Sequence, residues 1–282
     1  MNTRSGFVAV VGRPNVGKST LVNAICGEKV SIVSDKPQTT RHQVRGIFNE
    51  GDAQIVFVDT PGLHKPVSAL GERLNTTAQG ALADVDLVCF VIDATKPFGR
   101  GDRWVAERLP PAPVVIVNKA DRASRQQMLH QLSAVGEALP GADAFFPVSA
   151  LDGSGIEALV DHLLSRVGEG PLFYPPDSAS DMDDGKRVAE LVREQLLAVT
   201  REELPYSIAT RVAEWEGTRV RCEIVVERES QKGMVIGKGG SVLKQVGTAV
   251  RRQLPEGTYL ELVVTVDPDW QRRPDRVERL GY

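Results

Sequence analysis

The sequence is poor in cysteine, in long apolar runs and in net charge. Its three cysteines, Cys26, Cys89 and Cys222, are far apart and show no CxxC spacing, which excludes a disulfide framework and a zinc site of that kind. No apolar run reaches the roughly 18 residues that cross a bilayer, so no membrane span is predicted. The formal net charge of −3 gives no overall signature of nucleic-acid binding, and any basic surface must therefore be local.

The length and composition indicate an ordinary globular protein. A chain of 282 residues favours about two domains. Hydrophobic residues at 41% and charged residues at 25% lie near the globular average, which argues against disorder. The first strand pattern begins near Gly6 and leaves no room for a signal or transit peptide, so we expect a cytoplasmic protein.

Runs of apolar and β-branched residues alternate with helical patterns between residues 7 and 167. The runs are FVAVV, VRGIF, QIVFV, LVCFVI, PVVIV and AFFPV. Helix-length segments predict right-handed crossovers between parallel strands, whereas the turn from Asn49 to Asp52 predicts one hairpin with an antiparallel edge strand. We therefore expect residues 1–168 to form an α/β domain, a mixed, mostly parallel sheet with helices on both faces.

The chain changes character after residue 168. Residues 169–185 crowd proline, glycine, serine and acidic residues without periodicity, which is typical of a linker. A helical pattern over residues 187–200 then precedes the alternating runs SIATRVAEW and RVRCEIVVE, a glycine-rich loop with helices, and a last strand, YLELVVTV. Residues 186–282 are therefore expected to form an α+β domain in the order helix, strand, strand, helix, helix, strand.

The first strand leads directly into a phosphate-binding loop. The segment GRPNVGKST matches G-x-x-x-x-G-K-[ST] and opens a helix. Backbone N–H groups and the helix N-terminus favour a phosphate there, Lys18 neutralises its oxygens, and the Ser19 hydroxyl is a ligand for Mg²⁺. The domain is thus predicted to be a P-loop NTPase whose loop contacts the nucleotide through Gly12, Arg13, Pro14, Asn15, Val16, Gly17, Lys18, Ser19 and Thr20.

A second strand end supplies an acidic residue. The run QIVFV is followed by Asp59-Thr60-Pro61-Gly62, which matches DxxG at the spacing expected after a phosphate loop. The Asp59 carboxylate can hold Mg²⁺ through water, and the Gly62 N–H can reach a γ-phosphate. We expect these residues, with Thr60 and Pro61 between them, at the nucleotide.

The ends of the strands PVVIV and AFFPV indicate which base is bound. Both ends lie at the edge of the sheet where such folds bind ligands. Asp121 can accept hydrogen bonds from N1–H and the exocyclic amine of guanine, whereas adenine offers no matching pair of donors. GTP rather than ATP is therefore predicted, with contacts from Asn118, Lys119, Asp121, Ser149 and Ala150.

The last third of the chain carries a second candidate site. Gly237-Lys238-Gly239-Gly240 is a GxxG loop between helical patterns, and KH domains clamp about four backbone nucleotides over such a loop. Residues 230–255 contain no acidic residue and five basic ones. The predicted contacts to single-stranded RNA are Lys232, Ile236, Gly237, Lys238, Gly239, Gly240, Lys244, Arg251 and Arg252.

The nucleotide motifs resemble those of the translation-factor class of small GTPases, and KPQTTRH at residues 36–42 resembles the first switch of the Era family. The resemblance implies that Thr40 reaches Mg²⁺ and the γ-phosphate in the GTP state, with Thr39 as the alternative. It implies metal ligands Ser19, Thr40 and Asp59. It implies catalytic roles for Lys18, Thr40, Asp59 and Gly62, and a switch of Gln38, Thr39, Thr40, Arg41 and His42.

The residue after DxxG leaves the hydrolytic mechanism open. Ras-like proteins place a water-orienting glutamine there, whereas this chain has Leu63. Resemblance to GTPases with a hydrophobic residue at this position suggests that K⁺ held near Asn15 replaces an arginine finger. We expect His64 and Arg41 to be switch-surface residues rather than a general base and a finger.

The C-terminal element order and its GxxG loop resemble a type II KH domain, the bacterial type. The two parts together resemble the Era family over essentially the whole chain. This resemblance implies a monomer that binds GTP and GDP, hydrolyses GTP, binds the 3′ end of 16S rRNA and acts in assembly of the 30S ribosomal subunit. It also implies peripheral contact with the cytoplasmic face of the inner membrane.

Two other functions remain compatible with the sequence. The chain could be a constitutive RNA-binding scaffold whose nucleotide domain only adds stability, although the intact phosphate and base motifs argue against this. It could also be a GTPase that acts on a protein or membrane partner, with the KH-like domain as a docking surface.

Overall fold

A computed structural model describes residues 3–66, 68–200 and 204–282. The chain divides into two compact units. The first comprises Met1–Val33, Thr40–Pro66 and Arg73–Asp181. The second comprises Ser34–Thr39, Val67–Glu72 and Met182–Tyr282.

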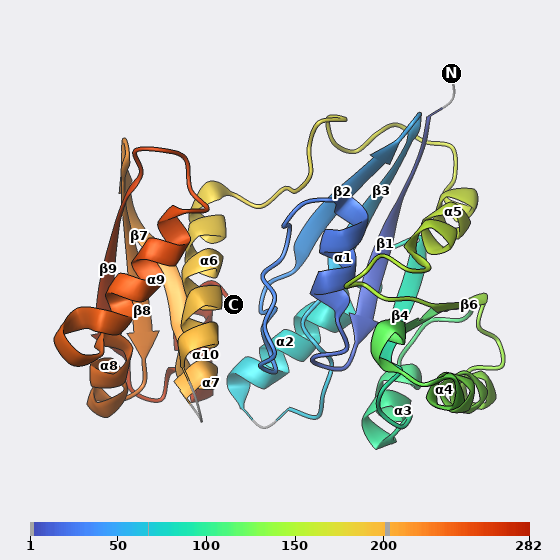
Figure 1. The fold of residues 1–282 in the computed structure, drawn as a ribbon, viewed down its shortest axis with the longest axis horizontal. Helices are drawn as coiled ribbons and strands as arrows, with labels where there is room; N and C mark the ends of the chain where they lie inside the picture. Colours follow the sequence, from blue (N-terminus) through green and yellow to red (C-terminus); the bar gives the residue numbers. More distant parts are fainter. Residues whose placement is uncertain (1–2, 67, 201–203) are drawn as a thin grey trace. The chain divides into compact units, whose positions relative to one another are not determined.

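The first unit is built on a six-stranded sheet (Figure 1). The strand order is β2-β3-β1-β4-β5-β6; neighbours from β3 to β6 are parallel, and β2 forms an antiparallel hairpin with β3. This confirms the predicted mixed, mostly parallel sheet. The strands are β1 (Arg4–Gly12), β2 (Val44–Glu50), β3 (Ala53–Asp59), β4 (Leu87–Asp93), β5 (Val114–Asn118) and β6 (Ala144–Pro147).

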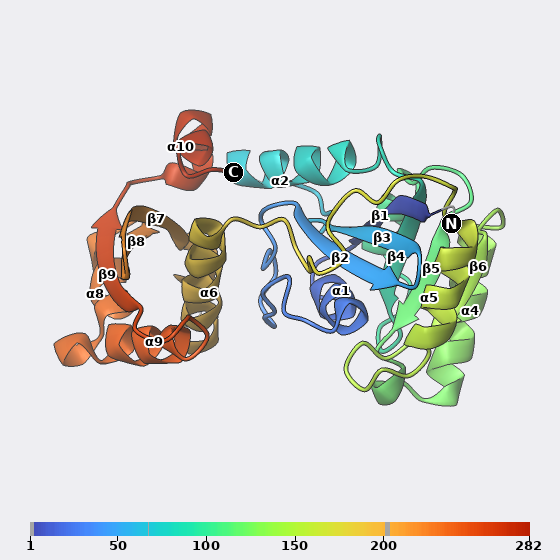
Figure 2. The same ribbon diagram turned by 90° about the horizontal axis from the view of Figure 1, so that it is seen from above.

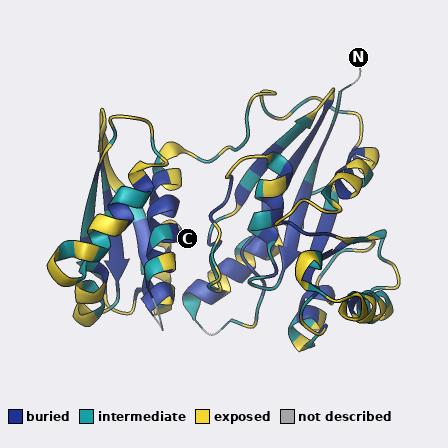
Figure 3. Cartoon of the chain, viewed as in Figure 1, coloured by how far each residue is buried: buried dark blue, intermediate teal, exposed yellow. Residues whose placement is uncertain are grey.

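Helices cover both faces of this sheet. One core cluster joins α2, α3 and α4 to β4 and β5. Figure 2 shows α1 and α2 on opposite sides of the strands. The inner strands β1, β3, β4 and β5 are buried almost throughout, as their dark blue colour in Figure 3 shows and as expected for a sheet covered on both faces, whereas the edge strands β2 and β6 are partly exposed. The helices are α1 (Lys18–Cys26), α2 (Ala69–Gly80), α3 (Arg100–Ala106), α4 (Arg125–Ala138) and α5 (Ile156–Arg166).

The segment after α5 is anchored along the first unit as far as Asp181. Its composition predicted only an irregular connection, but the buried side chain of Gln54 accepts hydrogen bonds from the N–H groups of Phe173 (2.8 Å) and Tyr174 (3.0 Å). Further along, Ile47 N donates to Ala179 O at 2.9 Å. These contacts attach the irregular backbone to β2 and β3. The sequence of the segment alone could not reveal this attachment.

The second unit contains a three-stranded sheet of order β7-β8-β9, with β7 antiparallel and β9 parallel to β8. Its main elements follow the predicted order, and the last strand has the predicted bounds. The short helices α7 (Leu204–Ser207) and α10 (Pro274–Arg279) were not anticipated. The main elements are α6 (Asp184–Val199), β7 (Ala209–Glu216), β8 (Arg219–Val226), α8 (Glu229–Ile236), α9 (Ser241–Arg251) and β9 (Tyr259–Val266).

The core of the second unit lies between its sheet and three helices. Val192 of α6, Val235 of α8 and Val246 of α9 are fully buried in one cluster with residues of β8 and β9. The Asp183 side chain begins α6 by accepting a hydrogen bond from Lys186 N at 2.8 Å, which satisfies a donor that the helix itself leaves unpaired. The cap fixes where α6 begins, and the shared cluster holds the three helices against the sheet.

No helix among the described residues is long and apolar enough to cross a bilayer.

Candidate active site and nucleic-acid interface

The phosphate loop joins the end of β1 to the start of α1 and requires glycine at two positions. Gly12 and Gly17 have φ values of 155° and 97°. A Cβ atom at Gly12 would lie 2.3 Å from the carbonyl oxygen of Val91, and one at Gly17 would lie 2.3 Å from Nδ2 of Asn118. Residues of β4 and β5 therefore lie so close to the loop that a side chain at Gly12 or Gly17 would deform the loop.

Lys18 is buried within this loop. Its Nζ donates to the carbonyl oxygens of Gly12 (3.3 Å) and Arg13 (3.1 Å). Burial lowers the pKa of Lys18 to about 8, although the charge of Asp59 acts in the opposite direction. An anionic phosphate at this position would favour the protonated form and supply the charge that the buried ammonium lacks.

Three oxygen-bearing side chains converge beside Lys18. Ser19 Oγ donates to Asp59 Oδ2 at 2.7 Å and lies 2.8 Å from Thr40 Oγ1, which in turn lies 3.5 Å from Asp59 Oδ2. Burial raises the pKa of Asp59, opposed by Lys18 and by these hydroxyls. Asp59 Oδ1 is buried and has no hydrogen-bond partner among the described residues. Hard oxygen donors with an unsatisfied carboxylate oxygen fit Mg²⁺.

The geometry distinguishes the two candidate switch threonines. Thr40 is buried and faces the oxygen cluster, whereas the Thr39 hydroxyl donates to Lys36 O at 2.7 Å. Of the other switch residues, Gln38 has a φ of 60° and His42 is half-buried. The structure thus brings Thr40, and not the Thr39 hydroxyl, to the predicted metal ligands.

The DTPG segment packs tightly on the phosphate loop. A Cβ atom at Gly62 would lie 2.6 Å from Pro14 N, and Leu63 N donates to Gly12 O at 3.1 Å. The fully buried Thr60 donates its hydroxyl to Val10 O at 2.8 Å. The Thr60 side chain therefore supports β1, and Thr60 can reach a nucleotide only through its backbone.

Leu63 points away from the site into the core. It is fully buried in the cluster that joins β4 and β5 to the helices. His64 is half-buried, and its Nδ1 lies 3.0 Å from Gly62 O. Arg41 is only 2% exposed, so the expectation that it lies on the switch surface is wrong.

The base loop is tied to the phosphate loop and to the next strand end. Asn118 Nδ2 donates to Val16 O at 2.9 Å, and Asn118 Oδ1 accepts from Ala150 N at 3.0 Å. Asp121 Oδ1 accepts a hydrogen bond from Ser149 Oγ at 2.8 Å, while the Asp121 residue itself is exposed. The structure therefore brings the two predicted base-recognition segments together with an acceptor available to solvent.

Two acidic residues that the sequence motifs did not identify form ion pairs with basic residues of the nucleotide-site loops. Asp93 binds Lys119 Nζ at 2.7 Å, and Asp102 of α3 binds Arg13 Nη1 at 3.0 Å. Arg13 therefore points its guanidinium at α3. Asp93 could have been found from the sequence, because it is the last residue of the apolar strand LVCFVID. This strand lies between β1 and β5, and the carboxyl ends of such strands carry ligand-binding residues.

The GxxG loop joins α8 to α9 and is open at its tip. Gly237, Gly239 and Gly240 have φ values of 74°, 60° and 79°. A Cβ atom at Gly237 would lie 2.6 Å from Val242 Cγ2, whereas nothing lies within 4 Å of one at Gly239 or Gly240. The first glycine is thus needed for packing, and the other two leave space for a close approach by a nucleic-acid backbone.

The predicted basic residues surround this loop on its flanking helices. Lys238, Lys244, Arg251 and Arg252 are exposed, and Lys232 is half-buried. Lys244 and Arg251 are seven residues apart on α9 and therefore share a helix face. Ile236 is partly buried against the core, next to the first glycine of the loop. The arrangement offers phosphate contacts beside an open backbone.

Comparisons with known proteins agree with both parts of this description. A family model described as a 50S ribosome-binding GTPase matches residues 7–119, and a KH domain model matches residues 203–271. The GTPase Era of Mycobacterium tuberculosis is 45% identical over 99% of this chain and 98% of its own length. That of Heliobacterium modesticaldum is 43% identical over 99% of this chain and 97% of its own.

Two solved structures share the whole fold. Era in complex with MgGDPNP and nucleotides 1506–1542 of 16S ribosomal RNA has a TM-score of 0.94 and is 37% identical. A variant of Aquifex aeolicus Era bound to GDP·AlF₄⁻ has a TM-score of 0.93 and is also 37% identical. Each match covers 99% of both chains. The chain belongs to the Era family of GTPases.

Proposed function

We propose that this protein is a GTP-hydrolysing switch that binds the 3′ end of 16S rRNA as single-stranded RNA and acts in assembly of the 30S subunit. The observation that carries the nucleotide part is the convergence of Ser19, Thr40 and Asp59 next to Lys18. The Era structure with a GTP analogue and 16S rRNA nucleotides supports the RNA part. The proposed boundaries are residues 1–168 for the GTPase domain, 169–185 for the linker and 186–282 for the RNA-binding domain.

The proposed roles in the GTPase site follow from chemistry and geometry. Lys18 would neutralise phosphate charge, and the Gly62 N–H would hold the γ-phosphate. Ser19, Thr40 and Asp59 would hold Mg²⁺, which when bound neutralises charge that develops on the phosphate oxygens. MgGDPNP in the related Era structure supports this ion. Guanine would be held by Asn118 and Asp121, with Ser149 orienting the Asp121 carboxylate.

Leu63 cannot position the hydrolytic water, because its side chain is buried in the core. K⁺ held near Asn15 is proposed to supply the positive charge that an arginine finger supplies in other GTPases. GTP turnover in K⁺ and in Na⁺ tests this, together with the variant Asn15→Ala. Turnover that is equal in the two ions and unaffected by the substitution overturns the K⁺ proposal without affecting the nucleotide site.

RNA would bind over the GxxG loop, where the Gly239 and Gly240 backbone is open and basic side chains lie on both flanking helices. The test is binding of a single-stranded 16S rRNA 3′-end oligonucleotide to the double variant Lys238→Asp with Gly239→Asp. A strong loss is expected. Arg125→Glu, an exposed charge reversal at the start of α4, is the control and should bind normally. Unchanged binding by the double variant would favour a GTPase that acts on a protein or membrane partner.

The two activities are proposed to be coupled. GTP would order residues 36–42 and 59–75, and hydrolysis would release RNA. Such coupling is reciprocal, so RNA must then change nucleotide affinity by the same factor. RNA affinity measured with GDP and with GDPNP should differ, and equal affinities would contradict the switch. We further propose a cytoplasmic monomer with peripheral membrane contact, which sedimentation and cell fractionation test.

A further inference from the structure

The side chain of Lys119 bridges two parts of the nucleotide site. Its Nζ donates to Asp93 Oδ2 at 2.7 Å and to the backbone carbonyl oxygen of Asn15, also at 2.7 Å. Asn15 belongs to the phosphate loop, Lys119 to the base loop and Asp93 to the end of β4. One ammonium group therefore ties the loop that would hold the phosphates to the loop that would hold guanine.

Asp93 is itself fixed from three directions. Its Oδ1 accepts hydrogen bonds from Thr95 N (2.9 Å) and Thr95 Oγ1 (2.6 Å), and its carbonyl oxygen accepts one from Gln131 Nε2 at 2.9 Å. The Asp93 side chain is 6% exposed. Burial alone would raise the pKa of Asp93, but the hydrogen bonds from Lys119 and Thr95 lower it, so the group is charged at neutral pH.

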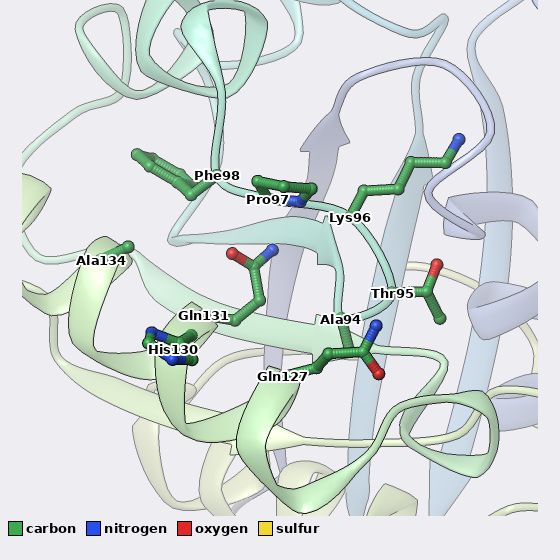
Figure 4. A pocket seen from close by; sticks show the side chains of 9 residues that line it. All are labelled: Ala94, Thr95, Lys96, Pro97, Phe98, Gln127, His130, Gln131 and Ala134. Carbon is green, nitrogen blue, oxygen red and sulfur yellow. The ribbon is translucent and has the colours of Figure 1, made fainter.

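A pocket lies next to this network. It has a volume of about 430 Å³ and is lined by residues 94–98 and by α4, with Thr95 and Gln131 on its wall (Figure 4). On this side the Asp93 carbonyl oxygen accepts hydrogen bonds from Gln131 Nε2 and from Lys96 N at 3.2 Å, which together fix the Asp93 backbone. Directed hydrogen bonds and the burial of Asp93 at the end of β4 therefore hold the network together.

We propose that Asp93 is a positioning residue for guanine-nucleotide binding, which acts by holding Lys119 in the geometry that ties the base loop to the phosphate loop. This inference rests on the proposed nucleotide site and extends it to a residue outside the motifs. Asp93 does not touch the nucleotide in this role. It acts through the ammonium of Lys119.

Backbone conformation explains why such a tie is needed. Lys119 and Asn15 have φ values of 68° and 64°, a region that residues with a Cβ atom adopt at a cost. A free lysine side chain also samples many rotamers, and fixing it only when the nucleotide arrives would reduce affinity. With Asp93 in place, both loops are already ordered before the nucleotide binds.

A double-mutant cycle tests the inference through GDP affinity. Asp93→Asn is expected to weaken GDP binding about tenfold in the unmodified protein and less than about twofold in a Lys119→Met background, because the partner it acts through is then absent. The same loss in both backgrounds, or no loss in either, overturns it. If the unmodified protein does not bind GDP, the proposed nucleotide site fails instead.

Binding of inosine diphosphate (IDP) distinguishes a positioning role of Asp93 from a general disturbance of the base loop. IDP lacks the exocyclic amine that Asp121 would bind, so the ratio of GDP to IDP affinity reports on Asp121. Asp93→Asn should weaken both nucleotides by the same factor and leave this ratio unchanged. A ratio that falls toward one shows that the whole loop is disturbed and overturns a specific role through Lys119.

Two more variants keep the test decisive. Asp143→Asn breaks contacts with His162 and Arg166 elsewhere in the same unit and should leave GDP affinity unchanged. If Asp93→Asn does not fold, Thr95→Val removes one hydrogen bond to the same carboxylate and should weaken GDP binding about two- to threefold. Unchanged GDP affinity in a folded Thr95→Val protein would contradict the inference, and so would a GDP loss of the same size in Asp143→Asn.

Discussion

The hydroxyl oxygens of Thr40 and Ser19 lie 2.8 Å apart, and both face the Asp59 carboxylate. Thr40 therefore lies where a first-switch ligand of Mg²⁺ is expected, although it is about twenty residues from both Ser19 and Asp59 in the chain. Replacing Thr40 by Val keeps the shape and removes one oxygen. We expect Thr40→Val to weaken Mg²⁺-dependent binding of GDPNP about tenfold or more, and GDP binding much less, because the first switch is held by the γ-phosphate.

Thr39→Val is the matched control for this prediction. The Thr39 hydroxyl bonds to the Lys36 carbonyl oxygen instead of to the oxygen cluster. Its replacement should leave GDPNP affinity within about twofold of the unmodified protein, since only a local hydrogen bond is lost. Titrating both variants with labelled GDPNP at several Mg²⁺ concentrations checks the pair. A larger effect at Thr39 than at Thr40 would reverse the assignment.

Residues whose role follows from local spacing could be predicted from the sequence. Gly17, Ser19 and Asp59 are placed by the ends of strands and the start of a helix, so a linear pattern is enough to locate them. The burial of Arg41 and of Leu63 could not be predicted, because both depend on which distant side chains pack around them. Long-range packing also decides the attachment of residues 169–181 to the strands of the first unit.

Leu63 is expected to act through stability rather than through catalysis. Its side chain is fully buried among β4, β5 and the helices that cover them. Leu63→Ala should lower the free energy of unfolding by about 2–5 kcal/mol. Leu63→Gln should also destabilise the protein without accelerating GTP hydrolysis, because the amide would enter an apolar core.

Urea unfolding and single-turnover GTP hydrolysis measure the two effects on the Leu63 variants. Leu151→Ala is the control, because Leu151 is 78% exposed and its loss should change stability by less than about 0.5 kcal/mol. An increase in hydrolysis by Leu63→Gln would show that the side chain can turn toward the nucleotide.

The three cysteines should be unreactive in the folded protein. Burial raises the pKa of Cys26, Cys89 and Cys222 to about 12. Because the folded pKa lies above the unfolded value of about 8.5, the protonated thiols contribute stability below that value and lose the contribution as pH rises toward 12. At pH 8 we expect labelling by a thiol reagent to be at least a hundredfold slower in the native state than in urea. Native labelling at the denatured rate would contradict this, and Cys26, which is half-buried, should react first.

The two kinds of glycine in the GxxG loop should respond differently to alanine. A Cβ atom at Gly237 would lie 2.6 Å from Val242 Cγ2, so Gly237→Ala should disturb the packing of α9 and lower the melting temperature. Gly239 has open space around it and a φ of 60°. Gly239→Ala should therefore cost only about 1 kcal/mol of backbone strain, while its methyl group occupies the surface where an RNA backbone would approach.

Gly257→Ala separates strain from RNA contact. Gly257 has a φ of 84° and likewise nothing within 4 Å of a Cβ atom, but it lies in the turn before β9. Both substitutions should lower stability by similar amounts, and only Gly239→Ala should weaken RNA binding, by about fivefold or more in fluorescence anisotropy, since it alone places a methyl group in the loop that KH domains use to clamp the backbone. Equal RNA affinities for the two variants would mean that RNA binds elsewhere on the domain, because the strain is common to both and only the position differs.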